Sequence, residues 1–323
     1  MFLRPLALIS CAARVAGLML LAMGLARAEL APGDYDLTLR HQNRERTYIV
    51  HVPRGRPDLD WPVVINLHGG GGHARAQQRY SQMDDVADRE GFLAVYPNGT
   101  GPLGNRLLTW NAGNCCGWAQ KNEVDDVGFI RALVEDLARR ASIDRTRIYA
   151  TGLSNGAMMS YRLVVEAPDL IAAIAPVAGA MVCLPFKAGR PISILHIHSV
   201  DDPRALYAGG LGPPFPLTNV RVQHPPVEKT ISHWVGFDGC APQPKVEPAL
   251  HGAGRSAKHS ATRIVYAPCR DGTEVVLWKL AGPGHVWPGG DIDYLTWALG
   301  PGTDIIDANT QMWRFFSRFR LDR

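Results

Sequence analysis

Short apolar segments alternate with longer amphipathic ones along most of this 323-residue chain, and this alternation is the strongest constraint on its fold. The apolar segments are rich in β-branched and aromatic residues and have the length of strands. Expected strands cover 47–52, 63–68, 92–96, 147–151, 172–177, 192–198 and 274–280. Several are almost wholly apolar, which is typical of strands covered by helices on both faces.

The segments between these strands show the apolar spacing of helices. Expected helices cover 77–90, 125–141, 155–167, 226–236 and 308–319. In the second, apolar residues recur at helical spacing from Val127 to Leu137, and Asp125 and Asp126 stand where they would cap its start. The alternation predicts an α/β fold, with a mainly parallel, doubly wound sheet and helices on both faces.

The first 28 residues have the features of an export signal. Arg4 and Arg14 supply positive charge, residues 15–25 form an apolar run, and Ala26-Arg27-Ala28 has the pattern of a cleavage site. We therefore predict removal of 1–28 and a secreted or periplasmic product. Two alternatives stay open: a membrane anchor, for which the apolar run is short, and lipidation at Cys11.

Charge and composition exclude some partners. The chain is 46% hydrophobic and 20% charged, which is ordinary for a globular protein, and its formal net charge is +4. Without the three arginines of the first 28 residues, 31 basic residues face 30 acidic ones. We therefore expect no nucleic acid partner, and no membrane contact beyond export.

Five cysteines follow the predicted signal: Cys115, Cys116, Cys183, Cys240 and Cys269. Export favours disulfides, and an odd number leaves at least one thiol without a partner in the chain. We expect Cys240 to pair with Cys269 across a polar excursion, and Cys115 or Cys116 to reach Cys183. No paired C-x-x-C spacing is present, so we expect no structural zinc site.

The segment Gly152-Leu153-Ser154-Asn155-Gly156 points most directly to chemistry. A G-x-S-x-G pattern places its serine on a tight, strained strand-to-helix turn, where larger flanking side chains would collide. The residues before it are strand-like and those after it are helix-like. We predict that Ser154 is a nucleophile, with the helix N-terminus behind it favouring negative charge.

A glycine-rich loop, His68-Gly69-Gly70-Gly71-Gly72, directly follows the expected strand 63–68. The backbone N–H groups of Gly70 and Gly71, together with that of Asn155, are candidate donors to a substrate oxyanion. A phosphate-binding loop is the alternative, but no Gly-Lys-Ser/Thr follows.

A catalytic base and an orienting acid are expected after Ser154, in the order acid, then histidine. The histidines after residue 202 are His224, His233, His251, His259 and His285. His285 is best placed, in a Gly/Pro-rich turn after the strand 274–280. Asp201 and Asp202 follow the strand 192–198, where one would orient the imidazole and the other would cap a loop.

Other residues carry weaker indications. Trp287, beside His285, and Trp110 are candidate substrate-binding residues. His196 and His198 alternate on one strand, and we expect packing or hydrogen bonding from them rather than metal binding. The Gly/Pro-rich segment 209–226 is either a surface connection or a lining or cover of the substrate cleft.

Together these segments resemble the secreted polyhydroxybutyrate depolymerase and feruloyl esterase-like α/β-hydrolases. The residues that carry the resemblance are 68–72, 96–99, 110–116, 124–129, 152–159, Cys240, Cys269 and 284–289. The resemblance implies an α/β-hydrolase fold, with 29–323 as a single catalytic domain. It also implies ester hydrolysis through an acyl-enzyme, without metal or cofactor.

Carried over by position, the resemblance implies that Ser154 is the nucleophile, His285 the base and Asp202 the acid. Family members resemble His-Gly-x-x-Asp-x-x-x-x-Tyr, which aligns with His198, Asp202 and Tyr207. This chain departs from that pattern: it has serine in place of the glycine, and Arg-Ala at 204–205 where apolar residues are usual. The departure keeps Asp201 open as the acid.

We predict a secreted serine esterase that acts on feruloyl or acetyl esters of plant polysaccharide, or on short hydroxyalkanoate oligomers. No Thr/Ser-rich linker or polymer-gripping segment is evident, which favours a soluble ester or oligomer. An exported serine peptidase is an alternative, but no acidic cluster for a peptide amine is evident. A non-catalytic binding protein is another, and it would be expected to lack the serine turn, the base or the glycine loop.

Overall fold

The computed structural model describes residues 30–55, 60–182, 188–214 and 221–322. The predicted signal, residues 1–28, lies outside these ranges, as does Cys183. Among the helices of the described ranges, none combines the length and apolar character needed to span a membrane.

In the described residues one large sheet has eleven strands, in the order β1-β2-β4-β3-β5-β6-β7-β13-β12-β10, with β11 beside β12. Its strands are β1 (Gly33–His41), β2 (Arg44–Val52), β3 (Trp61–Leu67), β4 (Leu93–Pro97), β5 (Ile143–Leu153), β6 (Ala173–Val177), β7 (Ser193–Ser199), β10 (Lys245–Val246), β11 (Leu250–His251), β12 (Ser260–Tyr266) and β13 (Val275–Ala281). The strands from β4 to β13 in this order are parallel, and the outer strands pair antiparallel. A two-stranded sheet joins β8 (Gly210–Leu211) to β9 (Gln223–His224).

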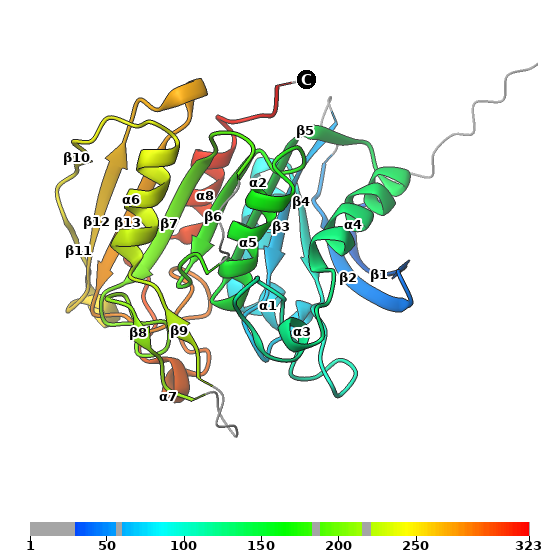
Figure 1. The fold of residues 1–323 in the computed structure, drawn as a ribbon, viewed down its shortest axis with the longest axis horizontal. Helices are drawn as coiled ribbons and strands as arrows, with labels where there is room; N and C mark the ends of the chain where they lie inside the picture. Colours follow the sequence, from blue (N-terminus) through cyan, green and yellow to red (C-terminus); the bar gives the residue numbers. More distant parts are fainter. Residues whose placement is uncertain (1–29, 56–59, 183–187, 215–220, 323) are drawn as a thin grey trace, which may run out of the picture.

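Helices cover both faces of the sheet (Figure 1). They are α1 (Ala74–Ser81), α2 (Met83–Glu90), α3 (Gly117–Lys121), α4 (Asp126–Arg140), α5 (Asn155–Glu166), α6 (Val227–Phe237), α7 (Thr296–Leu299) and α8 (Ala308–Phe316), with 3₁₀ turns at Gly254–Ser256 and Arg270–Gly272. Helices α4, α5 and α6 lie on one face, and α1, α2 and α8 lie on the other. The predicted doubly wound architecture is confirmed.

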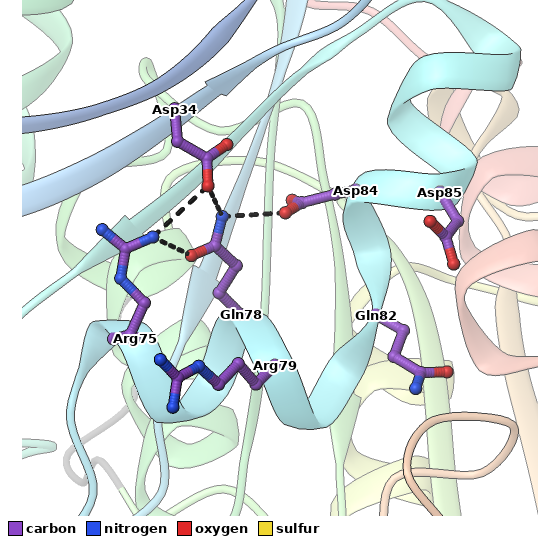
Figure 2. Close-up of a pocket in the computed structure, with 7 residues that line it drawn as sticks. All are labelled: Asp34, Arg75, Gln78, Arg79, Gln82, Asp84 and Asp85. Atoms are coloured by element: carbon purple, nitrogen blue, oxygen red, sulfur yellow. Dashed lines mark hydrogen bonds and ion pairs between the residues drawn. The ribbon is translucent and has the colours of Figure 1, made fainter.

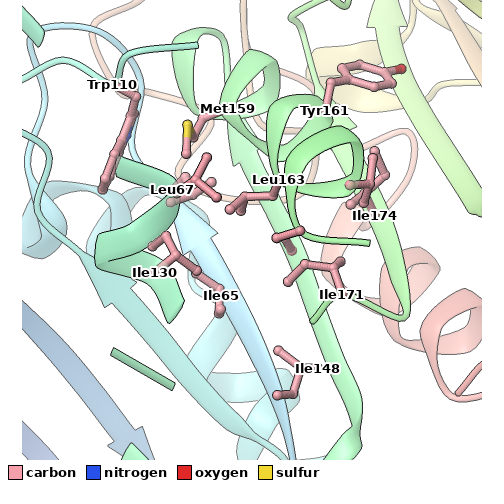
Figure 3. Packing of buried hydrophobic residues seen from close by; sticks show 14 of the residues in the cluster. Ile65, Leu67, Trp110, Ile130, Ile148, Met159, Tyr161, Leu163, Ile171 and Ile174 are labelled. Carbon is pink, nitrogen blue, oxygen red and sulfur yellow. The ribbon is translucent and has the colours of Figure 1, made fainter. Parts of the chain in front are cut away.

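Two apolar cores lie between these helices and the sheet. Alternate residues of β3 enter different cores: Val63 and Ile65 face the α4–α5 side, and Val64 faces the other. Figure 3 shows the first core, where Ile65 and Leu67 meet side chains of α4 and α5. Because the side chains of β3 are packed on both faces of the sheet, the strand holds the start of the glycine loop in a fixed position.

Each of the seven predicted strands matches a strand of the sheet, and the structure adds others at its edges. β1 was not predicted, because every second residue of it is exposed and its apolar content is low. The predicted helix 77–90 is two helices, because Gln82 has a left-handed φ of 54° that ends α1 before α2 begins.

The disulfides confirm one prediction and correct another. Cys240 is bonded to Cys269, as expected. Cys115 and Cys116 are bonded to each other, so the expectation that one of them reaches Cys183 is wrong. The two neighbours close a tight turn, in which the Ala112 N–H also donates to the Cys115 carbonyl.

Candidate active site

Ser154 lies on the turn between β5 and α5. Its φ of 57° and ψ of −115° fall outside the conformations that non-glycine residues ordinarily adopt. The turn packs against the end of β3: a Cβ on Gly152 would lie 2.6 Å from the Leu67 carbonyl oxygen, and one on Gly156 would collide with it. Only glycine fits at either position, and the Ser154 side chain remains partly exposed.

Asp202 and His285 form a buried hydrogen-bonded pair. His285 Nδ1 lies 2.7 Å from Asp202 Oδ2. Asp202 Oδ1 accepts hydrogen bonds from the backbone N–H groups of Arg204 at 2.7 Å and Ala205 at 2.8 Å. Because an ionised carboxylate only accepts, we assign the donated proton to His285 Nδ1, which leaves Nε2 as the basic nitrogen.

The pKa of Asp202 is held well below its ordinary value. Burial by itself would raise this pKa, but the electrostatic interaction with His285 and hydrogen bonds from His198 and His285 outweigh burial. Asp202 is therefore ionised at neutral pH, as the stabilisation of an imidazolium requires.

Asp201 makes different contacts from those of Asp202. Its Oδ2 accepts a hydrogen bond from the Gly282 N–H at 2.7 Å, and its own N–H donates to Ser199 Oγ at 3.2 Å. Asp201 is exposed and ties the loop after β7 to the end of β13. Of the two aspartates, Asp202 is the one that contacts His285.

Ser154, Asp202 and His285 follow the carboxyl ends of β5, β7 and β13. These strands belong to the parallel part of the sheet, so their carboxyl ends share one edge, at the bottom of Figure 1. Within the described ranges no hydrogen bond joins Ser154 to His285. The bond between nucleophile and base is often long before substrate binds.

The glycine loop provides fewer free N–H groups than the sequence predicts. The Gly71 N–H donates to the Leu108 carbonyl at 2.7 Å, so Gly71 is not placed as an oxyanion donor. In the part of the chain that the structure describes, the N–H groups of Gly70 and Asn155 donate to no protein acceptor. Asn155 is the first residue of α5, where an N–H has no acceptor within the helix.

His68 holds the glycine loop in shape. Its Nδ1 lies 2.8 Å from the Gly69 carbonyl oxygen, and its Nε2 lies 3.0 Å from the Gly99 N–H. These partners assign the proton to Nδ1, and burial lowers the pKa of His68 to about 4, so the ring is neutral. Since the carbonyl and N–H of a trans peptide point in opposite directions, holding the Gly69 carbonyl orients the Gly70 N–H.

The Asn155 side chain has a supporting role that the sequence does not reveal. Its Oδ1 accepts from the Trp110 N–H at 2.7 Å, and its Nδ2 donates to the Trp110 carbonyl at 3.0 Å. The Trp110 indole in turn donates to the His68 carbonyl at 3.0 Å. These bonds join the start of α5 to the glycine loop, and so hold the two candidate oxyanion donors in one frame.

The two tryptophans predicted to bind substrate are buried. Trp110 is 0% exposed and Trp287 is 1% exposed, so neither ring presents a surface to substrate in this structure. The Trp287 indole N–H donates to Asn309 Oδ1 at 2.9 Å, and the Trp287 backbone N–H donates to Tyr80 Oη at 2.8 Å. This corrects the expectation: both rings anchor loops beside the site, because each finds its polar partners inside the protein.

The described part of the segment 209–226 lies close to the Asp202–His285 pair. It forms β8 and β9, at the same end of the molecule as α7 (Figure 1). On β9, His224 is buried, and its pKa is lowered to about 4 by burial and then by its electrostatic interaction with His285. This favours the interpretation that the segment lines or covers the cleft.

Two further histidines were expected only to pack or to form hydrogen bonds. His196 and His198 are both buried on β7, and hydrogen bonds through them link Tyr161 of α5 to the Ala205 carbonyl. His198 Nε2 also lies 3.3 Å from Asp202 Oδ2. For His198 the sequence signal is its alignment with the family pattern that also contains Asp202, and His196 alternates with it on the same strand.

A cavity of about 420 Å³ lies away from these residues, between β1, α1 and α2 (Figure 2). Asp34, Arg75 and Gln78 are joined there by hydrogen bonds, and Gln78 also bonds Asp84. Asp34, Asp84 and the neighbouring His51 could offer ligand atoms within 4.8 Å of one another. Their charges are already paired with one another or with Arg75, so the cluster by itself identifies no metal site.

Comparison with known proteins places this architecture in a family. The family described as "Esterase PHB depolymerase" matches residues 46–212, which include the glycine loop, the Ser154 turn and Asp202. The protein named "Putative esterase NocK" of Nocardia uniformis subsp. tsuyamanensis is 31% identical over 80% of this chain and 75% of its own length. "Feruloyl esterase B" of Piromyces equi is 30% identical over 74% of this chain but only 42% of its own length.

Solved structures share the fold at low sequence identity. An acetyl xylan esterase from Aspergillus awamori superposes with a TM-score of 0.57 at 15% identity, over 88% of this chain and 99% of its own. A dienelactone hydrolase-like phosphotriesterase from metagenomic libraries gives a TM-score of 0.56 at 15% identity, over 90% of this chain and 99% of its own. The predicted α/β-hydrolase fold is therefore confirmed. The chain belongs to the Esterase PHB depolymerase family, a family of carboxylic ester hydrolases.

Proposed function

We propose that this chain is an exported serine esterase in which Ser154 is the nucleophile, His285 the base and Asp202 the acid. The observation that carries the proposal is the 2.7 Å hydrogen bond between His285 and Asp202, at the sheet edge where the strained Ser154 turn also lies. These residues could supply the nucleophile, the general base and the orienting acid that acyl transfer by a serine requires.

The first half of the reaction forms an acyl-enzyme. His285 Nε2 takes the proton from Ser154 Oγ as the oxygen attacks the ester carbonyl. Asp202 accepts the hydrogen bond from His285 Nδ1 and stabilises the imidazolium. The protonated Nε2 then gives the proton to the leaving alcohol oxygen, and the C–O bond of the ester breaks.

The second half returns the serine. A water molecule loses a proton to His285 Nε2 and attacks the acyl carbonyl. The intermediate collapses as Nε2 returns the proton to Ser154 Oγ, which releases the acid. In both halves the N–H groups of Gly70 and Asn155 would donate to the oxyanion, and losing one such donor typically costs about 10²–10³ in kcat.

The substrate class is proposed from the relatives. One of them is named a feruloyl esterase, and another is the "Bifunctional acetylxylan esterase/xylanase XynS20E" of Neocallimastix patriciarum, of which this chain covers 33%. We propose feruloyl or acetyl esters of plant polysaccharide fragments, with short hydroxyalkanoate oligomers as the other ester class. Export directed by residues 1–28 would place the enzyme where such esters occur. N-terminal sequencing of the exported protein tests this export, and we expect the sequence to begin at Glu29.

The test is hydrolysis by the mature protein and its Ser154→Ala variant on a panel of esters. The panel holds methyl ferulate, an acetylated xylo-oligosaccharide, 3-hydroxybutyrate oligomers and a p-nitrophenyl acyl-length series. We expect hydrolysis of at least one natural-type ester, lost in Ser154→Ala, with the preferred ester naming the substrate class. Parent-level hydrolysis by Ser154→Ala would contradict the nucleophile. Silence of the folded parent on every ester would favour the peptidase or binding-protein alternatives.

A further inference from the structure

A chain of buried hydrogen bonds leads from the nucleophile helix to the catalytic acid. Tyr161 Oη lies 2.9 Å from His196 Nδ1, and His196 Nε2 lies 3.1 Å from His198 Nδ1. His198 Nε2 lies 2.7 Å from the Ala205 carbonyl oxygen and 3.3 Å from Asp202 Oδ2. Tyr161, His196 and His198 are each at most 2% exposed, so water does not compete for these bonds.

The acceptors beside His198 indicate the direction in which hydrogen bonds are donated along this series. Both groups beside His198 Nε2 are acceptors, a carbonyl and an ionised carboxylate, so Nε2 carries a proton and donates. Burial and the nearby His198 lower the pKa of His196 well below its ordinary value, so His196 is neutral and carries one proton. Where His198 carries only the proton on Nε2, its Nδ1 accepts from His196 Nε2, and His196 Nδ1 accepts from Tyr161 Oη.

This series of hydrogen bonds connects parts of the site that are distant in sequence. Tyr161 lies on α5, the helix that begins directly after Ser154. His198 reaches the turn after β7, where the N–H of Ala205 donates to Asp202 Oδ1 while its carbonyl accepts from His198. The turn that presents the acid is therefore bonded, through β7, to the helix that presents the nucleophile.

Resting on the proposed function, we propose that His198 is a positioning residue for the Asp202–His285 pair, and that His196 and Tyr161 fix its orientation. His198 shares Asp202 Oδ2 with His285 and so limits both the direction and the charge of that oxygen. Without this donor, less of the negative charge of the Asp202 carboxylate is neutralised. The carboxylate then stabilises the imidazolium form of His285 more strongly. Losing the donor also frees the turn to tilt the acid away from the base.

Several ionisable groups surround the carboxylate, and a test must leave them in place. They are Tyr80, His198, Arg204, His224 and His285. Among the described residues, only His198 and His285 of this group contact the carboxylate through their side chains. A shift of the pH profile that follows substitution of His198 therefore reports the loss of its contacts with Asp202 and with the Ala205 carbonyl beside it.

The experiment compares His198→Leu, His198→Gln and Tyr161→Phe with the parent on a soluble p-nitrophenyl ester. We measure kcat, KM and the pH profile of kcat/KM, together with thermal stability. Tyr149→Phe is the matched control: it also removes a tyrosine hydroxyl that donates to one acceptor, the Phe319 carbonyl at 2.7 Å, but from the core on the other face of the sheet.

We expect His198→Leu to lower kcat about tenfold, with KM changed less than about twofold, because a hydrogen bond to a charged group acts here in the transition state. The acidic limb of its pH profile should move to higher pH. His198→Gln retains an N–H donor and should recover most of kcat. Tyr161→Phe should lower kcat by about two- to threefold and move the acidic limb of the pH profile to higher pH, as His198→Leu does. Tyr149→Phe should keep the parent kcat and pH profile.

A parent-like kcat and pH profile in His198→Leu would overturn the proposal, whatever its thermal stability. If that variant does not fold, Tyr161→Phe decides, and kinetics indistinguishable from Tyr149→Phe would overturn it. Ser154→Ala separates this result from the proposed function. If Ser154→Ala is inactive while the histidine variants match the parent, only the positioning role fails.

Discussion

Replacing Asp202 by asparagine should impair the enzyme by moving the proton of His285 from Nδ1 to Nε2. Asp202 Oδ1 accepts two backbone N–H groups, from Arg204 and Ala205, so the amide oxygen of Asp202→Asn must stay there. The amide nitrogen then takes the Oδ2 position and donates toward His285 Nδ1. His285 must therefore hold its proton on Nε2, where it cannot accept the proton of Ser154.

The magnitude follows from losing the base while the fold is kept. Placing the imidazole in the wrong tautomer lowers kcat about 10⁴-fold in a serine triad, which is about 5 kcal/mol of transition-state stabilisation. Asp201→Asn is the matched control, because Asp201 bonds the Gly282 N–H and not His285. It should keep kcat within about twofold, since a neutral acceptor serves that loop.

The assay is kcat on p-nitrophenyl acetate at pH 7.5, with thermal unfolding of each variant to verify the fold. We expect Asp202→Asn to unfold close to the parent temperature and to lose nearly all turnover. The reasoning would be refuted by a folded Asp202→Asn within tenfold of the parent kcat. It would also be refuted if Asp201→Asn were the more damaging change.

Three further outcomes follow from buried contacts. In Gly156→Ala the new Cβ would collide with the Leu67 carbonyl, so we expect the free energy of unfolding to fall by about 3 kcal/mol and hydrolysis to be lost; denaturant unfolding that matches the parent would contradict the packing of this turn. Burial raises the pKa of Asp238 to about 7, so its ionisation makes the folded state less stable as pH rises toward 8. Asp238→Asn should therefore be more stable than the parent at pH 8, by up to roughly 4 kcal/mol, with the difference shrinking toward pH 4; a pH-independent difference would refute the burial argument. The disulfide between Cys240 and Cys269 closes a separation of 29 residues, so replacing both by serine should cost about 3–4 kcal/mol in unfolding free energy, and an unchanged melting temperature would show that the loop is held by other contacts.

The fold was largely predictable because local patterns and tertiary structure agree in its centre. Buried parallel strands such as β3 are almost wholly apolar, and α4 is capped at its start by Asp125, as its sequence indicates. The edges were harder. β1 alternates between half-buried and exposed residues, so little apolar content marks it, and the break at Gln82 depends on a backbone conformation that no local residue type demands.

The candidate site divides in a similar way. Ser154 was indicated by the G-x-S-x-G pattern, whose two glycines leave no room for a Cβ. His285 was indicated by its Gly/Pro-rich turn after a strand, and Asp202 by its position after another strand. Which of two adjacent aspartates meets the histidine depends on the direction of a single turn, which the structure decides through the His285–Asp202 contact.

The donors and supports were less predictable. Gly71 belongs to the glycine loop, yet its N–H is taken by a carbonyl 37 positions further along the chain, that of Leu108. Trp110 was expected to meet substrate because large aromatic residues often line clefts, but its indole and backbone both bond inside the protein. Such partnerships arise from long-range contacts, which leave no local pattern in the sequence.

The central claim is that Ser154 is the nucleophile, and the most direct test is to locate a covalent label. The mature protein is treated with a fluorophosphonate probe and digested, and the labelled peptide is identified by mass spectrometry. We predict one adduct per chain on Ser154, absent in Ser154→Ala and greatly slowed in His285→Ala. Labelling at another residue, or ester hydrolysis that continues after Ser154 is fully labelled, would contradict the account.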